Sequence, residues 1–192
     1  MNLSALSTVQ VAIIVAVTVL LVASIAIFLA IRKRNTKRLR TQFGGAEYNR
    51  AVKEGGSRQK AEALLDKRAD RVESFHIQPL GPGDHARFLD SWRRVQSRFV
   101  DVPGAAVTEA DQVLRDVMST RGYPVGDFEQ RAADLSVDHP QVLDHYRFAH
   151  EIAVRHTHGQ AGTEELRQAM IHYRTLFEEL VGEPELAHTK TA

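Results

Sequence analysis

Residues 11–31 read VAIIVAVTVLLVASIAIFLAI, a run of 21 residues without a charged side chain, and residues 32–40 follow as RKRNTKRLR. As an α-helix the apolar run is about 31 Å long, which matches the roughly 30 Å hydrocarbon core of a bilayer. The hydroxyls of Thr18 and Ser24 are compatible with this environment, because they can bond to carbonyls of the preceding turn. The run therefore predicts one transmembrane helix.

Two other interpretations of the run are disfavoured. A cleaved signal peptide typically has a basic N-terminal region, a shorter apolar stretch and small residues before the cleavage site. Here no charged side chain precedes residue 32, the run is longer, and Ile31 is followed directly by Arg32 and Lys33. A core helix of a soluble protein is the second alternative, but such helices rarely contain so long a stretch without a charge.

Six basic residues and no acidic residue lie directly after the apolar run. They are Arg32, Lys33, Arg34, Lys37, Arg38 and Arg40. The positive-inside rule places the flank that carries them in the cytoplasm and the N-terminus outside. At the membrane interface each of them attracts anionic headgroups by about 1 kcal/mol. We therefore expect residues 11–40 to have membrane lipid as a partner. The orientation of the helix in the membrane is enough to explain the basic cluster. Specific lipid recognition has no separate support in the sequence.

The basic cluster hides the charge of the rest of the chain. The protein has 25 basic and 24 acidic residues, so without the six of the cluster 19 basic residues remain, and the part from residue 41 onward has a net charge of −5. An acidic domain argues against nucleic acid as a partner, and we expect it to stand off an anionic membrane. The chain has no cysteine, which excludes disulfides, thiol nucleophiles and thiolate metal sites.

Composition divides the chain into six segments. We expect a short extracytoplasmic tail at 1–10, the transmembrane helix at 11–31, a basic juxtamembrane segment at 32–43, a charged helical spacer at 44–76, a compact all-α domain at 77–182 and a frayed tail at 183–192. The glycine pairs Gly44-Gly45 and Gly55-Gly56 are expected to interrupt helices. Ser57 is expected to cap a charged helix. The apolar stripe of that helix is thin, which favours a spacer or an arm that packs on a partner over a part of the core.

Capping and turn residues delimit the helices of the compact domain. Pro82 suits a first helical turn, and Thr108 and Thr163 are expected to cap two later helices. Asp127, with Gln130 three residues on, is expected to cap a short helix that ends near Leu135. Apolar residues recur at helical spacing, and no segment alternates as a strand does. The predicted fold class is all-α: one N-terminal transmembrane helix followed by a charged helical spacer and a small helical bundle.

Nine histidines raise the question of a metal site. Two ligands on one helix face need a spacing of three or four residues, which His145, His150, His156 and His158 do not provide among themselves. His145 and His156 share a face but lie about 16 Å apart along the helix, too far for one ion. His172 is able to approach His145 or His150 from a facing helix, and the sequence leaves this open. We predict no metal and no cofactor.

The stretch RGYPVGDFEQRAADLSVDHP at 121–140 is the densest in polar and turn residues. In a functional interpretation its side chains form a surface site made of Arg121, Tyr123, Asp127, Glu129, Arg131, Asp134, Asp138 and His139. In a structural interpretation, which we favour, the same stretch supplies caps and turns, and Arg131 pairs with Asp134 on one helix. No signature of phosphate binding, nucleophilic catalysis or metalloprotease chemistry occurs, so no catalytic residue and no small-molecule ligand are predicted.

Several strings resemble a widespread family of uncharacterised bacterial proteins. They are Phe43-Gly44 with Glu47-Tyr48, Arg98-Phe99-Val100-Asp101, Glu109-Ala110-Asp111 and, most specifically, the stretch at 121–140. Members of that family are commonly a membrane helix followed by such a helical region, and the resemblance covers about residues 41–181. It implies a bacterial source and an inner-membrane location, without an activity, a cofactor or a catalytic residue. Gly45 departs from an expected proline, and Gly81 from a serine that would cap the next helix.

Three functional hypotheses follow. The first is a membrane-anchored cytoplasmic interaction module, a scaffold or adaptor that binds another protein and whose tethering raises the local concentration. The second is a small-ligand-binding or enzymatic domain that uses the 121–140 segment; convergence of Asp127, Arg131, Asp134 and His139 in one pocket would favour it. The third is self-association through the membrane helix, which has small alanines but lacks a GxxxG face.

Overall fold

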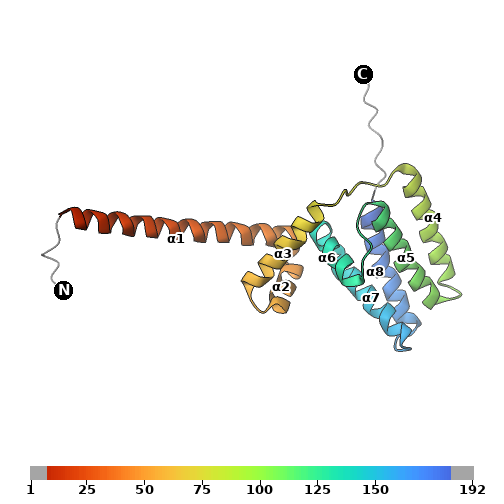
Figure 1. Ribbon diagram of the computed structural model, residues 1–192. Coiled ribbons are helices and arrows are strands. Elements are labelled where there is room, and N and C mark those ends of the chain that lie inside the picture. Colours follow the sequence, from red (N-terminus) through yellow and green to blue (C-terminus); the bar gives the residue numbers. More distant parts are fainter. Residues whose placement is uncertain (1–7, 183–192) are drawn as a thin grey trace, which may run out of the picture.

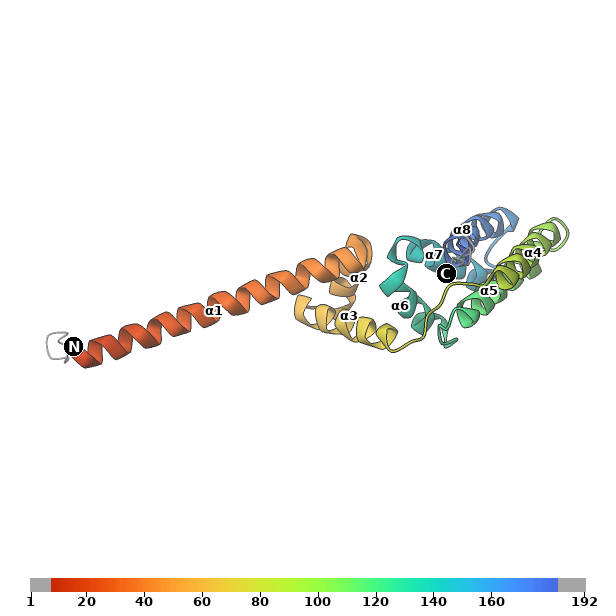
Figure 2. The same ribbon diagram turned by 90° about the horizontal axis from the view of Figure 1, so that it is seen from above.

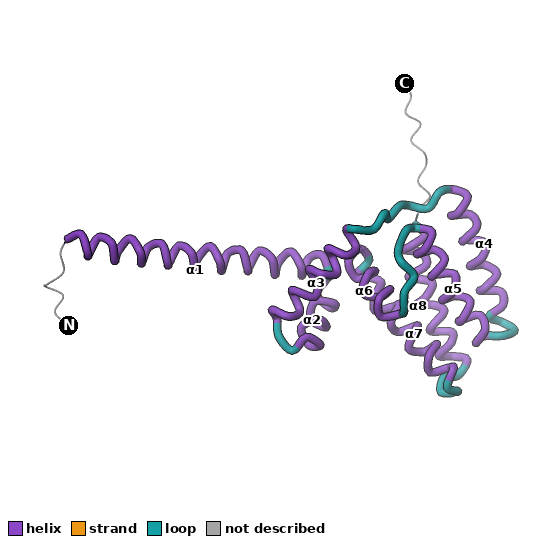
Figure 3. The backbone as a smooth tube through the Cα atoms, in the orientation of Figure 1, coloured by secondary structure: helices purple, strands orange, loops and turns teal. Residues whose placement is uncertain are grey.

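The computed structural model describes residues 8–182, and within that range it is all-α, as the sequence predicts. One long helix projects from a helical body, and loops connect the helices without any strand between residues 8 and 182 (Figures 1 and 3). The elements are α1 Thr8–Gln42, α2 Gly44–Gly55, α3 Arg58–Glu73, α4 Pro82–Arg98, α5 Pro103–Thr120, α6 Phe128–Asp138, a 3-10 turn at Pro140–Val142, α7 Leu143–Thr157 and α8 Thr163–Val181. The tail expected at 1–10 lies largely, and the tail expected at 183–192 wholly, outside the described residues.

Helix α1 is long and apolar enough to cross a membrane, and among residues 8–182 no other helix is. It continues for 35 residues, and its side chains are exposed from residue 10 to residue 34. The hydroxyls of Thr18 and Ser24 each donate to the carbonyl four residues earlier at 2.8 Å, as expected for hydroxyls in apolar surroundings. The apolar run and the basic cluster are thus one continuous helix.

The α2–α3 hairpin folds back beside the last turns of α1 (Figure 2). Gly44 has a φ of +69°, which lets the chain turn directly after Phe43 and confirms the predicted break. Ser57 caps α3, since its hydroxyl accepts the backbone N–H of Lys60 at 3.3 Å, also as predicted. Local chemistry therefore sets both ends of the hairpin.

The hairpin and the end of α1 share a small apolar core. It consists of Leu39, Phe43, Tyr48, Ala51, Ala61, Leu65, Val72 and Val137. Leu39 and Phe43 are fully buried at the end of α1, and Val137 adds a side chain from α6. The segment expected to be a spacer thus has a core of its own, because the apolar stripe of α3 packs against α1, α2 and α6 of the same chain.

The body of the protein is a bundle of α4, α5, α7 and α8, and α6 lies between α3 and α7 (Figure 1). Its core includes the fully buried rings of Tyr146 and Tyr173. Trp92 of α4 stacks on Phe177 of α8 with ring centroids 4.6 Å apart. The predicted small helical bundle is confirmed.

Two of the predicted caps are wrong. Thr108 lies inside α5, which already starts at Pro103, because proline suits the first helical turn and sets its dihedral angle. Thr163 is the first residue of α8, whose N-cap is Gly162. The carboxylate of Glu165 accepts the N–H of Gly162 at 3.0 Å, so an acid in the first turn satisfies this helix end.

Leu65 and Leu64 offer a matched test of the smaller core, since Leu65 is 0% and Leu64 40% exposed. Leu65→Ala should lower the free energy of opening of the α2–α3 hairpin by about 2–5 kcal/mol, because it removes buried methyl groups and leaves a cavity. Leu64→Ala should change it by no more than about 0.5 kcal/mol. Hydrogen exchange of the α3 amides in the full chain, held in detergent micelles, measures this free energy. Equal effects of the two substitutions would contradict the packing of α3.

Candidate functional site

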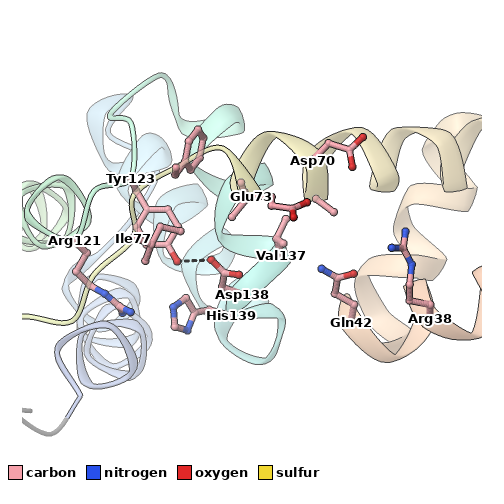
Figure 4. Close-up of a pocket in the computed structure, with 13 residues that line it drawn as sticks. Arg38, Gln42, Asp70, Glu73, Ile77, Arg121, Tyr123, Val137, Asp138 and His139 are labelled. Carbon is pink, nitrogen blue, oxygen red and sulfur yellow. Dashed lines mark hydrogen bonds between the residues drawn. The ribbon is translucent and has the colours of Figure 1, made fainter.

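A cleft of about 560 Å³ opens between the end of α1, α3, the end of α6 and the connections that precede α4 and α6 (Figure 4). Its lining residues are Arg38, Gln42, Ala69, Asp70, Val72, Glu73, Phe75, Ile77, Arg121, Tyr123, Val137, Asp138 and His139. Half of the candidate residues of the 121–140 stretch therefore meet here: Arg121, Tyr123, Asp138 and His139.

Residues 121–123 form one wall of the cleft, and backbone contacts fix its position. The N–H of Gln78 donates to the carbonyl of Arg121 at 2.9 Å. Gly122 has a φ of +97°, and a Cβ atom at this position would lie 2.3 Å from the carbonyl oxygen of His76. Only glycine allows this close approach of two chain segments. The two connections therefore lie against each other and position Tyr123 in the cleft.

Tyr123 and Asp138 are bonded to each other in the cleft. The tyrosine hydroxyl donates to Oδ2 of Asp138 at 2.7 Å (Figure 4). Burial, followed by the hydrogen bond and charge of Asp138, raises the pKa of Tyr123 above its ordinary value. The hydroxyl therefore stays protonated near neutral pH and acts as a hydrogen-bond donor rather than as a base or nucleophile.

His139 has one bonded and one unbonded ring nitrogen. Its Nδ1 lies 2.9 Å from Oε1 of Glu179, an oxygen that also accepts from Gln141 at 2.6 Å. The side chain is buried, with 9% of the residue exposed, and its Nε2 has no hydrogen-bond partner among residues 8–182. This nitrogen therefore lacks the hydrogen bond that buried polar atoms usually make.

Carboxylates and guanidinium groups share the cleft. Asp70, Glu73 and Asp138 contribute negative charge, and Arg38 and Arg121 contribute positive charge. In the described part of the chain no three histidine or carboxylate side chains are grouped so that they could hold a metal ion. The lining thus suits a small polar ligand that carries both charges.

Three of the remaining candidates lie outside the cleft. Oδ1 of Asp127 accepts the N–H of Gln130 at 2.8 Å, which confirms the predicted cap of α6. Asp134 is fully buried and accepts from Nε of Arg71 at 3.0 Å and from the Gln130 amide at 2.8 Å. Glu129 is exposed. These side chains cap α6, attach it to α3 or face solvent.

Arg131 also has a structural role. Its Nε donates to the hydroxyl of Tyr146 at 2.9 Å and its Nη1 to the carbonyl of Gly126 at 2.6 Å. The predicted pair between Arg131 and Asp134 is wrong, because tertiary partners replace the neighbour on the same helix. Asp127, Arg131, Asp134 and His139 therefore do not converge in one pocket, which weighs against an enzymatic role for the 121–140 stretch.

A second groove, of about 520 Å³, lies beside α7. Its lining residues are Arg50, Phe128, Glu129, Asp144, Arg147, Phe148, His150, Glu151, Val154 and Arg155. Phe148 is 45% exposed, Val154 is also exposed, and the ring of Phe128 stacks on His150 with centroids 3.6 Å apart. This α7 groove combines exposed apolar side chains with flanking charges of both signs.

A buried carboxylate that sequence reasoning did not single out joins the hairpin to the body. Glu47 of α2 accepts from Nη1 of Arg68 at 2.7 Å and from Nη1 of Arg147 at 2.5 Å. Burial alone would raise the pKa of Glu47, but the hydrogen bonds and charges of Arg147 and Arg68 outweigh it and lower the pKa. The two partners lie 100 and 21 residues away in sequence, so no local pattern identifies them.

The open question about His172 is resolved in favour of His145. The two Nδ1 atoms lie 2.6 Å apart, so one ring donates a proton and the other accepts it. Both rings cannot be charged in this arrangement. Burial, together with the charge of His145, lowers the pKa of His172.

This histidine pair predicts a loss of stability at mildly acidic pH. An unfolded chain protonates histidine as the pH falls through about 6.5, whereas the folded chain resists protonation of His172. Because the unfolded state then binds more protons, the Tm of the full chain in detergent should fall between about pH 7.5 and pH 5. His172→Gln should reduce this fall, and His76→Gln, which removes an exposed histidine, should not. Circular dichroism during heating measures the Tm of each variant at each pH. The same fall in Tm in both variants would show that the histidine pair does not cause it.

No protein-family model, no curated protein and no solved structure matches the chain.

Proposed function

We propose that α1 crosses the inner membrane of a bacterium once, with the N-terminus outside and the helical domain in the cytoplasm. The length and the absence of charge in residues 11–31 support the span. The six basic residues that follow it support the orientation. The resemblance of residues 121–140 to a family of bacterial membrane proteins supports the location.

In that position the chain acts as a membrane-anchored interaction module, a scaffold or adaptor for another protein. The observation that carries this proposal is the junction between α1 and the hairpin. Leu39 and Phe43 are fully buried there, and the hydroxyl of Thr36 donates to the buried Glu62 at 2.6 Å. A continuous helix joined in this way holds the domain in one orientation at the membrane, which reduces the freedom that a partner must lose on binding.

The α7 groove is the surface that we assign to the partner. Phe128, Phe148 and Val154 provide its apolar part, and the charged residues around them provide a polar rim. An apolar centre within a polar rim is the usual composition of a protein interface. An amphipathic helix of the partner, with one apolar face and charged flanks, matches this groove.

Co-purification of the full chain from cross-linked membranes tests the adaptor role. We expect a reproducible protein partner whose recovery falls about tenfold or more with Phe148→Ser, because the interface loses an exposed aromatic side chain that the bound partner covers. Val100→Ser is the matched control, since Val100 is 82% exposed but lies in the turn after α4, away from the groove. Val100→Ser should recover the partner within about twofold of the amount that the unchanged chain recovers. The adaptor role fails if no partner is reproducible or if both variants lose it equally.

A second candidate is the binding of a small polar ligand in the cleft between α1, α3 and α6. His139 favours it, because its buried Nε2 has no partner within residues 8–182, and the mixed charge of the lining suits such a ligand. A small molecule that stays bound to the purified full chain, and that His139→Phe releases, would favour this function over the adaptor.

A further inference from the structure

A third hollow, of about 510 Å³, lies between α1 and the start of α3. Its lining residues are Leu29, Arg32, Lys33, Thr36, Lys37, Arg40, Thr41 and Arg58. Five of these side chains are basic and none is acidic. We call this hollow the basic groove. Such a concentration of positive charge in a concave surface favours an anion as ligand.

The basic groove has two walls, because Arg58 belongs to α3 and its other lining residues belong to α1. Nε of Arg58 donates to the hydroxyl of Tyr48 at 2.9 Å and to Glu62 at 3.1 Å. Glu62 in turn accepts from Thr36 of α1 at 2.6 Å. This chain of bonds holds Arg58 opposite α1, so folding assembles a site that the juxtamembrane sequence does not contain by itself.

Three of the five cations of the groove have no carboxylate partner in the described range. Arg32, Lys33 and Lys37 form no ion pair with any residue of the described range, and the guanidinium of Arg40 lies 5.1 Å from the ring centroid of Tyr48. Arg38, which does not line the basic groove, pairs with a carboxylate of α3. Asp66 of the hairpin thus pairs outside the groove, and Glu62 pairs with Arg58 alone, so the groove stays positive.

The position of the groove along α1 distinguishes between possible anions. Leu29 lies in the apolar run, and Thr41 lies about 18 Å further along the helix axis. The headgroup layer on each side of the hydrocarbon core is roughly 5–8 Å thick. With α1 across a bilayer, the groove begins at the hydrocarbon boundary and continues through the headgroups. A free phosphate ion makes no use of Leu29, whereas a phospholipid presents an anion and an acyl chain together.

We propose that the basic groove binds the headgroup of an anionic phospholipid from the membrane that α1 crosses. The phosphate accepts hydrogen bonds from Arg32 and Lys33 of α1 and from Arg58 of α3, and an acyl chain lies against Leu29. The bound lipid connects α3 to α1 and stabilises their junction. The inference rests on the proposed membrane span and is independent of the adaptor role.

A lipid titration of the full chain in a neutral detergent tests the proposal. Phosphatidylglycerol and phosphatidylcholine with the same acyl chains are added at about 0.15 M salt, and binding is measured from the rise in Tm. We expect a saturable rise with phosphatidylglycerol and none with phosphatidylcholine. Lys33→Gln and Arg58→Gln should each raise the half-saturating concentration of phosphatidylglycerol about fivefold or more.

Arg34→Gln is the matched control, because Arg34 is the neighbour of Lys33 and loses the same charge at the same depth but does not line the groove. It should change the half-saturating concentration less than about twofold. Equal losses in Lys33→Gln and Arg34→Gln would overturn the proposal, since they indicate diffuse attraction by the whole cluster. Lys33 has no bonded partner in the described range, so its substitution separates lipid binding from the loss of the Arg58 hydrogen bonds.

Inorganic phosphate provides the remaining arm of the test. We expect it to leave the Tm unchanged at concentrations at which phosphatidylglycerol saturates the rise. The same rise with inorganic phosphate would overturn the assignment to a lipid, because the anion alone would then account for binding. The detergent titration requires no protein partner, so its outcome does not depend on the co-purification experiment.

Discussion

The last two turns of α1 join an apolar membrane helix to a folded domain. Leu39 and Phe43 are fully buried under the α2–α3 hairpin, and Thr36 donates to Glu62 at 2.6 Å. Helices bend sharply mainly at proline or glycine, and α1 contains neither. The chain therefore has no flexible link between the apolar run and the hairpin, and the direction of every later helix relative to α1 depends on this buried contact.

Two buried carboxylates extend the junction into the body of the protein. Glu62 accepts from Thr36 of α1, and Glu47 accepts from Arg68 of α3 and Arg147 of α7. Removing charges from water is unfavourable, so we attribute to these pairs a fixed geometry rather than a large gain in stability. Glu47 holds α7 against the hairpin, and Glu62 holds α1 against it. Both the α7 groove and the basic groove therefore keep defined positions relative to the membrane helix.

The features that local chemistry determines were predictable from the sequence: the apolar run, the break at Gly44 and the cap at Ser57. The cap expected at Thr108 was wrong, because a threonine with an acid three residues on occurs inside helices as well as at their ends. The candidate site was only half predictable. The partner of Asp134 is Arg71, 63 residues away, and the spacing of polar residues within one stretch carries no information about such a contact. The basic groove was missed for the same reason, since one of its walls comes from another helix.

The distance between α1 and the far side of the body tests the rigid junction most directly. The native chain has no cysteine, so Arg34→Cys on α1 and Arg93→Cys on α4, both exposed, allow two spin labels to be attached without competing sites. Pulsed electron spin resonance of the full chain in lipid nanodiscs gives the distribution of the distance between the labels. The buried junction predicts one narrow distribution. A broad distribution, as a flexible tether produces, would contradict the account.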